Sequence, residues 1–193
     1  MPNGEAEDVL NPPAGLLSRL FVGIKVAPEI GHRLAQFASG LESPFVRPVA
    51  PADIHLTLVP PWNKSCVPGA IARLNRVAGG FSAFWLDFRH VGYGPQARRP
   101  HLLWVDCTVG DEGAALRAAL LDAFGQIDER PFQPHVTLAR IRAGGHAICK
   151  KYPIDQPLSL RQRVASIELF QSPPSGERGY VVLASTKLQD VSC

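Results

Sequence analysis

The apolar positions of the chain fall into two patterns. Short runs of strand length predict seven strands, and leucines recurring at helical spacing predict three helices. The predicted strands cover residues 20–26, 54–59, 82–91, 101–109, 136–141, 164–170 and 180–185, and the predicted helices cover 28–41, 67–77 and 111–127. Several strands follow one another without an intervening helix, which favours an antiparallel or mixed α+β fold.

Proline and glycine set the expected boundaries of these elements. Pro28 begins the first helix, and the glycines at 79–80 end the second. Residues 43–51 are expected to be extended or looped because of their prolines, and the prolines at 60–61 are expected to end the second strand. Residues 1–18 read as a flexible lead, which leaves 19–193 as a single domain.

Composition narrows the class of protein. The chain has 193 residues, of which 46% are hydrophobic and 19% charged, so it suits one globular domain or two small lobes sharing a core. A net charge of +3 is compatible with an anionic substrate but is too small for a protein that coats duplex nucleic acid. There is no apolar run of membrane-spanning length and no basic start typical of a secretory signal.

The four cysteines point to a reducing compartment. Cys66, Cys107, Cys149 and Cys193 are widely spaced and form no CxxC pair, so we expect reduced thiols and a cytoplasmic protein.

One element is repeated at long range. HLTL at residues 55–58 and HVTL at residues 135–138 lie 80 residues apart, each on a predicted strand. Because strand side chains alternate between faces, each motif buries two aliphatic residues and presents a histidine beside a threonine on the opposite face. If the two strands are close in space, the four polar side chains converge.

This constellation suits acid–base chemistry on a phosphodiester. With ordinary pKa values near 6.5, one of His55 and His135 can be neutral and accept a proton while the other is protonated and donates one. The hydroxyls of Thr57 and Thr137 can donate to phosphate oxygens as charge builds there. Two other interpretations are less favoured: incidental polar faces, and a zinc site, which lacks a third ligand near either motif.

These residues carry a resemblance to a known family. The paired motifs, RLFVGI at 19–24 and RPFQPHVTLAR at 130–140 resemble the 2H phosphoesterase superfamily, in particular its RNA 2′,3′-cyclic phosphodiesterase branch, historically called 2′-5′ RNA ligase. The resemblance implies an α+β, bilobal fold in which two pseudo-symmetric lobes line a central cleft with antiparallel sheets and carry helices outside. It implies hydrolysis of a 2′,3′-cyclic phosphate to a 2′-phosphomonoester with no metal and no cofactor.

The resemblance also implies roles for individual residues. His55 is expected to be the proton donor and His135 the proton acceptor, with Thr57, Thr137 and Arg140 binding the substrate phosphate. Strict alternation places Arg140 on the face opposite His135, so it reaches the cleft only if the strand ends or bulges there. His32, His90, His101 and His146 lack a repeated context and are expected to be surface or structural residues.

The sequence departs from the family after the first motif. Many members continue with a Phe-Leu-Gly type segment, whereas this chain has VPPW at 59–62. Trp62 either stacks on a base or covers the core, and the second interpretation is at least as favoured.

The expected substrates are RNA 3′ ends or small nucleotides with a cyclic phosphate, acted on by a monomer with no membrane association. Three alternatives stay open. The chain could hydrolyse an ADP-ribose cyclic phosphate or a 2′,5′-linked oligonucleotide, it could run the chemistry in reverse as a ligase, or it could be a non-catalytic module that binds RNA ends.

Overall fold

The computed structural model describes residues 19–63, 66–96, 99–142, 146–173 and 177–190, so the predicted lead 1–18 lies outside it. Three long helices are present, α1 (Pro28–Ser39), α2 (Val67–Ala78) and α3 (Gly110–Phe124), with a short helix α4 (His146–Lys151) and a 3-10 turn η1 (Pro51–Asp53). The strands are β1 (Arg19–Lys25), β2 (Val46–Pro48), β3 (His55–Asn63), β4 (Phe84–Gly94), β5 (Leu102–Thr108), β6 (His135–Ile141), β7 (Gln156–Val164), β8 (Ser166–Gln171) and β9 (Val181–Lys187).

The predicted strands and helices are all present, and the differences lie at prolines and on an exposed edge. The prediction that Pro60 and Pro61 end the second strand is wrong, because β3 continues through them to Asn63. The pairing of β3 with β1 shifts register in this stretch, and such irregular positions tolerate the missing amide hydrogen of proline. Strands β2 and β7 and helix α4 were not predicted.

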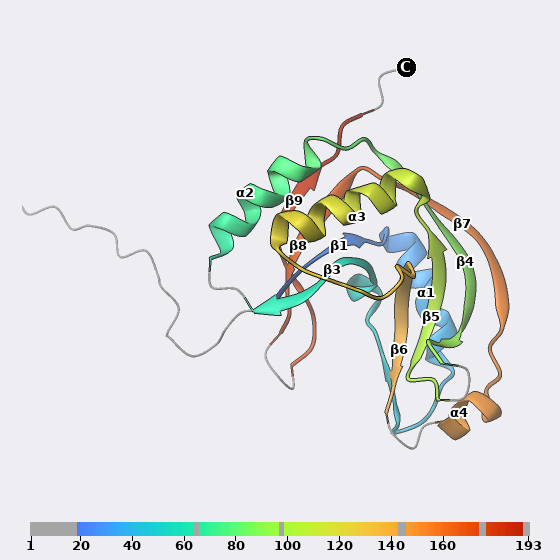
Figure 1. Cartoon of the computed structure of the whole chain (residues 1–193). Helices are drawn as coiled ribbons and strands as arrows, with labels where there is room; N and C mark the ends of the chain where they lie inside the picture. Colours follow the sequence, from blue (N-terminus) through green and yellow to red (C-terminus); the bar gives the residue numbers. More distant parts are fainter. Residues whose placement is uncertain (1–18, 64–65, 97–98, 143–145, 174–176, 191–193) are drawn as a thin grey trace, which may run out of the picture.

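The strands form one antiparallel sheet in the order β7-β4-β5-β6-β3-β1-β8-β9, with β2 added beside β6. Its two halves meet where β3 pairs with β6, through the register pair Leu56 and Val136. Each half contains the same unit, an inner strand, a helix and then the strand with the HxT motif: β1-α1-β3 and β5-α3-β6. The expected pseudo-symmetric α+β arrangement is therefore confirmed, with the two halves joined in one curved sheet (Figure 1).

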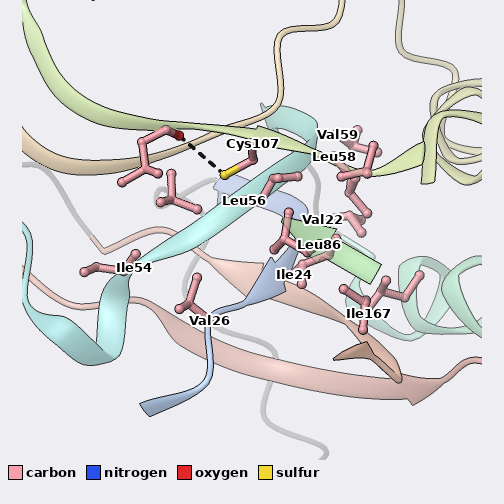
Figure 2. Close-up of a cluster of buried hydrophobic side chains, with 14 of the residues drawn as sticks. Val22, Ile24, Val26, Ile54, Leu56, Leu58, Val59, Leu86, Cys107 and Ile167 are labelled. Atoms are coloured by element: carbon pink, nitrogen blue, oxygen red, sulfur yellow. Dashed lines mark hydrogen bonds between the residues drawn. The ribbon is translucent and has the colours of Figure 1, made fainter. Parts of the chain in front are cut away.

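The helices cover the face of the sheet that carries the aliphatic residues. Helices α2 and α3 lie side by side (Figure 1). Helix α2 contacts β8 and β9, and helix α3 contacts β3 and β4. Leu56 and Leu58 of β3 pack with Val22 and Ile24 of β1 in the cluster drawn in Figure 2. None of the helices in the described part of the chain is long and apolar enough to cross a membrane.

Candidate active site

The two HxT motifs come together at the seam between the halves of the sheet. Because Leu56 is opposite Val136 in an antiparallel pair, His55 stands across from Thr137 and Thr57 across from His135. These four side chains line one pocket with a volume of about 140 Å³. The pocket is completed by Val49, Asp53, Leu102, Arg140 and Tyr180. The structure therefore brings all five predicted site residues to one place.

Both imidazoles are oriented in the same way. Nδ1 of His55 donates to the backbone oxygen of Asp53 at 2.7 Å, and Nδ1 of His135 donates to that of Gln133 at 2.8 Å. Since a carbonyl oxygen only accepts, each bond requires the hydrogen on Nδ1, and Nε2 is then an acceptor in the neutral ring and a donor in the protonated ring. The site thus presents two equivalent nitrogens suited to proton transfer.

His55 is packed among aromatic rings. The ring centroids of Phe21, Tyr180 and Phe170 lie 4.8, 4.9 and 5.4 Å from that of His55. Burial in this cluster lowers the pKa of His55 below its ordinary value of 6.5, and the positive charge of Arg140 adds to the effect, against an opposing contribution from the bond to Asp53. These surroundings therefore favour the neutral form of His55.

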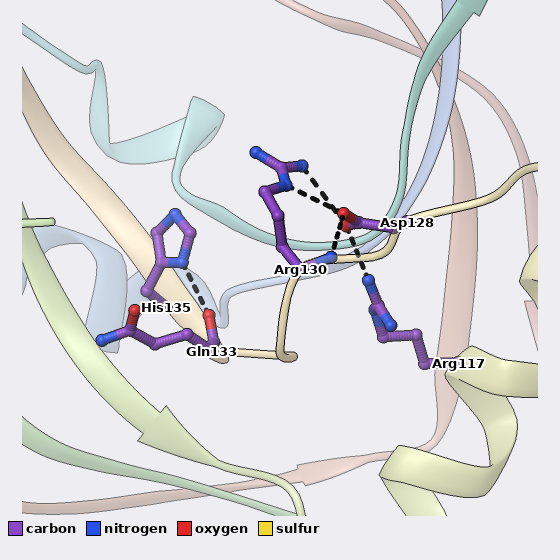
Figure 3. Close-up of polar contacts among 5 residues, drawn as sticks. All are labelled: Arg117, Asp128, Arg130, Gln133 and His135. Atoms are coloured by element: carbon purple, nitrogen blue, oxygen red, sulfur yellow. Dashed lines mark hydrogen bonds and ion pairs between the residues drawn. The ribbon is translucent and has the colours of Figure 1, made fainter.

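His135 has a different surrounding. The centroid of its ring lies 4.5 Å from that of Trp104. Trp104 is on the neighbouring strand β5, in register with Thr137. The carbonyl of Gln133 that orients it belongs to the loop between α3 and β6 (Figure 3). The environment of this imidazole thus depends on how that loop is held.

Asp128 anchors this loop to helix α3. Its carboxylate accepts from Nη2 of Arg117 at 2.8 Å, and both side chains are only 12% exposed (Figure 3). Arg130 also donates to it, and these bonds, with the charge of Arg117, hold the pKa of the Asp128 carboxyl below its ordinary value. The guanidinium of Arg117 lies over the ring of Phe132, 4.4 Å from its centroid. Asp128 and Arg117 therefore position the segment that leads into His135.

Arg140 reaches the pocket because β6 bulges. Leu103 is in register with Ala139, whereas Trp104 is in register with Thr137, so the ladder skips Leu138. Leu138 and Ala139 are both fully buried, and Arg140 then returns to the face that carries Thr137. The bulge that the prediction for Arg140 required is present.

Other predicted candidates lie away from the pocket. Trp62 is 9% exposed, and the centroid of its ring lies 4.9 Å from that of Phe124. Trp62 therefore covers the core and does not offer a surface on which a base could stack. His90 contacts Asp155 and lies 3.8 Å from Asp106, which agrees with a structural role. Among the residues that the structure describes, no group of three or more His, Cys, Asp or Glu side chains is placed to hold a metal ion.

The pocket residues Val49, Asp53, Leu102 and Tyr180 were not predicted from the sequence, nor was Gln133, which orients His135. Asp53, Gln133 and Tyr180 contact the two motif histidines. The first two share a signal, because each is two residues before a motif histidine. Tyr180 has no such signal. It comes from the segment before β9, where its backbone N–H donates to Oδ1 of Asp53 at 3.1 Å and its ring contacts His55.

Comparisons with known proteins agree with this geometry. The family model of the 2′-5′ RNA ligase superfamily matches residues 26–170. An RNA 2′,3′-cyclic phosphodiesterase of Bacillus subtilis is 25% identical over 164 residues, covering 79% of this chain and 90% of that protein. One of the same name from Geobacillus stearothermophilus is 28% identical over 170 residues, covering 81% of this chain, although the match spans only 50% of the length of that relative.

Solved structures share the fold. A protein of Thermus thermophilus superposes with a TM-score of 0.73 at 22% identity, covering 90% of this chain and 100% of the other. The structure of E. coli LigT complexed with 3′-AMP gives a TM-score of 0.69 at 24% identity, covering 89% of this chain and 98% of the other. Because the family model spans well over half of the chain and both of its HxT strands, the chain belongs to the 2′-5′ RNA ligase superfamily of 2H phosphoesterases.

Proposed function

We propose that the chain hydrolyses the 2′,3′-cyclic phosphate of RNA ends or small nucleotides to a 2′-phosphomonoester. The observation that carries the proposal is the paired arrangement of His55 and His135, each with Nδ1 bound to a carbonyl, beside two threonines in one pocket. The names of the two bacterial relatives support the same activity.

The proposed reaction needs one proton acceptor and one donor. Nε2 of His135 takes a proton from water as the water oxygen attacks phosphorus. The bond between phosphorus and the 3′ oxygen breaks, and that oxygen takes a proton from Nε2 of His55, which leaves a 2′-phosphate and a 3′-hydroxyl. The hydroxyls of Thr57 and Thr137 and the guanidinium of Arg140 bind the non-bridging oxygens, where negative charge builds. The final exchange of a proton with solvent restores both imidazoles.

The lowered pKa of His55 fits the role of donor if the substrate binds first. Burial lowers the pKa of His55 and favours its neutral form, whereas the negative charge of a bound phosphate favours its protonated form. An imidazolium whose pKa is low is also the stronger acid, and it gives its proton more readily to a leaving oxygen. Binding of the phosphate and protonation of His55 are therefore coupled.

The test uses 2′,3′-cyclic AMP and an RNA hexamer ending in a cyclic phosphate, both in EDTA, with the product identified by phosphorus NMR. We expect a 2′-phosphate, a bell-shaped pH profile and a loss of at least about a hundredfold in kcat/KM for His55→Ala and for His135→Ala. His32→Ala is the matched control, because this histidine is exposed on α1.

Four outcomes would contradict the proposal. Loss of all activity in EDTA would exclude a metal-free mechanism. A 3′-phosphate product would mean that the other ester bond breaks. Tight binding without turnover would favour a non-catalytic module for RNA ends, and selective turnover of a 2′,5′ linkage or an ADP-ribose cyclic phosphate would favour another activity of the superfamily.

A further inference from the structure

The short strand β2 extends the pocket along the sheet. Val49, just after β2, lines the pocket, and its backbone N–H donates to the carbonyl of Leu138 at 2.8 Å, which continues the ladder with β6. Val46 packs against the hydrophobic core, as does part of Val49, and Arg47 is in register with Arg140, which lines the pocket. Because side chains alternate along a strand, Arg47 lies on the pocket face, one step beyond Val49.

Arg47 and Arg140 stand directly opposite each other in the register of β2 and β6. Side chains in such a pair have Cβ atoms about 5 Å apart, and like charges there are unfavourable. Within the described part of the chain neither guanidinium forms an ion pair with a carboxylate, and Arg47 makes a hydrogen bond only to the backbone oxygen of Glu177, at 3.2 Å. Four other arginines do pair with aspartates, namely Arg117, Arg130, Arg161 and Arg163.

An exposed aromatic ring lies at the start of β2. Phe45 is 44% exposed, and its carbonyl accepts from the N–H of Arg142 at 2.8 Å, so the ladder extends one residue beyond β2. Phe45 itself ends the turn that leads into β2, two residues before Arg47 in the chain. A positive groove with an aromatic ring on which a base stacks is the combination that binds single-stranded nucleic acid.

We propose that Phe45 and Arg47 form a second subsite that binds single-stranded RNA upstream of the terminal nucleotide. The proposal rests on the proposed function and narrows its substrate class to oligonucleotides. The cyclic phosphate occupies the pocket, Arg47 binds the next phosphodiester along the strand, and the upstream base stacks on Phe45. The anionic strand also removes the repulsion between Arg47 and Arg140.

The test compares kcat/KM for a hexa-adenylate ending in 2′,3′-cyclic phosphate with that for 2′,3′-cyclic AMP. The ratio of the two should fall about tenfold in Arg47→Ala and at least about fivefold in Phe45→Ala, the lower end of the loss when a stacking ring is removed. Phe45→Trp should keep the wild-type ratio. An equal fall for both substrates would overturn the proposal, because it would mean that these residues act on the pocket itself.

The dependence on salt gives a second readout. The slope of log(1/KM) against log salt for the hexamer should become shallower by about 0.7 in Arg47→Ala, the contribution of one phosphate contact to a single strand. Arg47→Lys keeps the charge and should restore the slope. Arg76→Ala is the control, because it removes an exposed charge on α2, which packs against β8, β9 and α3. An unchanged slope in Arg47→Ala would refute the phosphate contact.

Binding separates a failure of the subsite from a failure of the proposed function. If neither substrate is turned over, the proposed function is wrong, and the subsite is then decided by affinities for a hexamer ending in 2′-phosphate and for 2′-AMP. A wild-type preference for the hexamer that falls about tenfold in Arg47→Ala supports the subsite. No preference in the wild type overturns it.

Discussion

Gly23 allows β1 to approach the strand that carries His55 and Thr57. It is in register with Thr57 on one side and with Glu168 on the other. A Cβ added at Gly23 would lie 2.6 Å from the backbone oxygen of Leu56, and ordinary contact begins at 3.4 Å, so the strands would have to separate by about 0.8 Å. The backbone of β3 must move, because the clashing atom is not the end of a flexible side chain.

We therefore expect Gly23→Ala to affect stability and activity together. Overpacking of this kind costs about 1 to 3 kcal/mol, and at about 2 to 4 °C per kcal/mol for a chain of this size the Tm should fall by about 2 to 12 °C. A displacement approaching 1 Å at the motif should lower kcat/KM for 2′,3′-cyclic AMP by about tenfold to a hundredfold.

Calorimetric melting and steady-state kinetics measure the two effects. Gly40→Ala is the matched control, because an added Cβ at Gly40 meets nothing within 4 Å and its backbone φ of −85° suits any residue. It should leave activity unchanged and raise stability slightly, by about 0.4 to 1 kcal/mol. A Gly23→Ala protein with the Tm and kcat/KM of the wild type would refute the reasoning, since β1 and β3 would then have room for a methyl group.

Three further changes test how the histidines are held. Asp128→Ala leaves the guanidinium of Arg117, which is 12% exposed, without its carboxylate partner, so urea denaturation should show a loss of about 3 kcal/mol in the free energy of unfolding. Asp190→Ala is the control: it removes the 85% exposed partner of Arg163 and should leave the denaturation curve unchanged. Tyr180→Ala removes one of the rings that bury His55. Since burial lowers the pKa of His55, an NMR titration should find that pKa raised towards 6.5 in Tyr180→Ala, whereas Tyr180→Phe should keep the wild-type pKa. A pKa that stays low in Tyr180→Ala would contradict burial by the aromatic rings as the cause. Binding of 2′-AMP at pH 7 should take up a proton that calorimetry in two buffers detects and that His55→Ala abolishes. No uptake in the wild type would contradict the coupling of phosphate binding to protonation of His55.

The sequence predicted the parts of the fold whose pattern is local. The strands that carry the two motifs and the three long helices have apolar spacing that fits one period, and the structure contains them. Strand β7 escaped prediction because its side chains are mostly exposed and include Arg161 and Arg163, so it has no apolar run. Strand β2 has three residues, too few for any period to be visible.

The parts of the site that could not be predicted depend on pairing between distant segments. Strict alternation placed Arg140 away from the pocket, and only the register of β6 against β5 shows the bulge that returns it. The extension of β3 through Pro60 depends in the same way on its pairing with β1. Tyr180 meets His55 because the segment before β9 crosses to Asp53, a contact between distant residues that no local motif encodes.

The fold repeats the geometry of the motif but not its surroundings, and this difference fits the proposed division of roles between one acid and one base. Both histidines use Nδ1 in the same way, yet His55 is enclosed by three aromatic rings, whereas His135 contacts Trp104. Equal surroundings would make the two imidazoles compete for one proton with no preferred direction of transfer. Burial lowers the pKa of His55, so in the proposed reaction the negative charge of the phosphate favours protonation of His55 in the complex where a leaving oxygen is present to accept the proton.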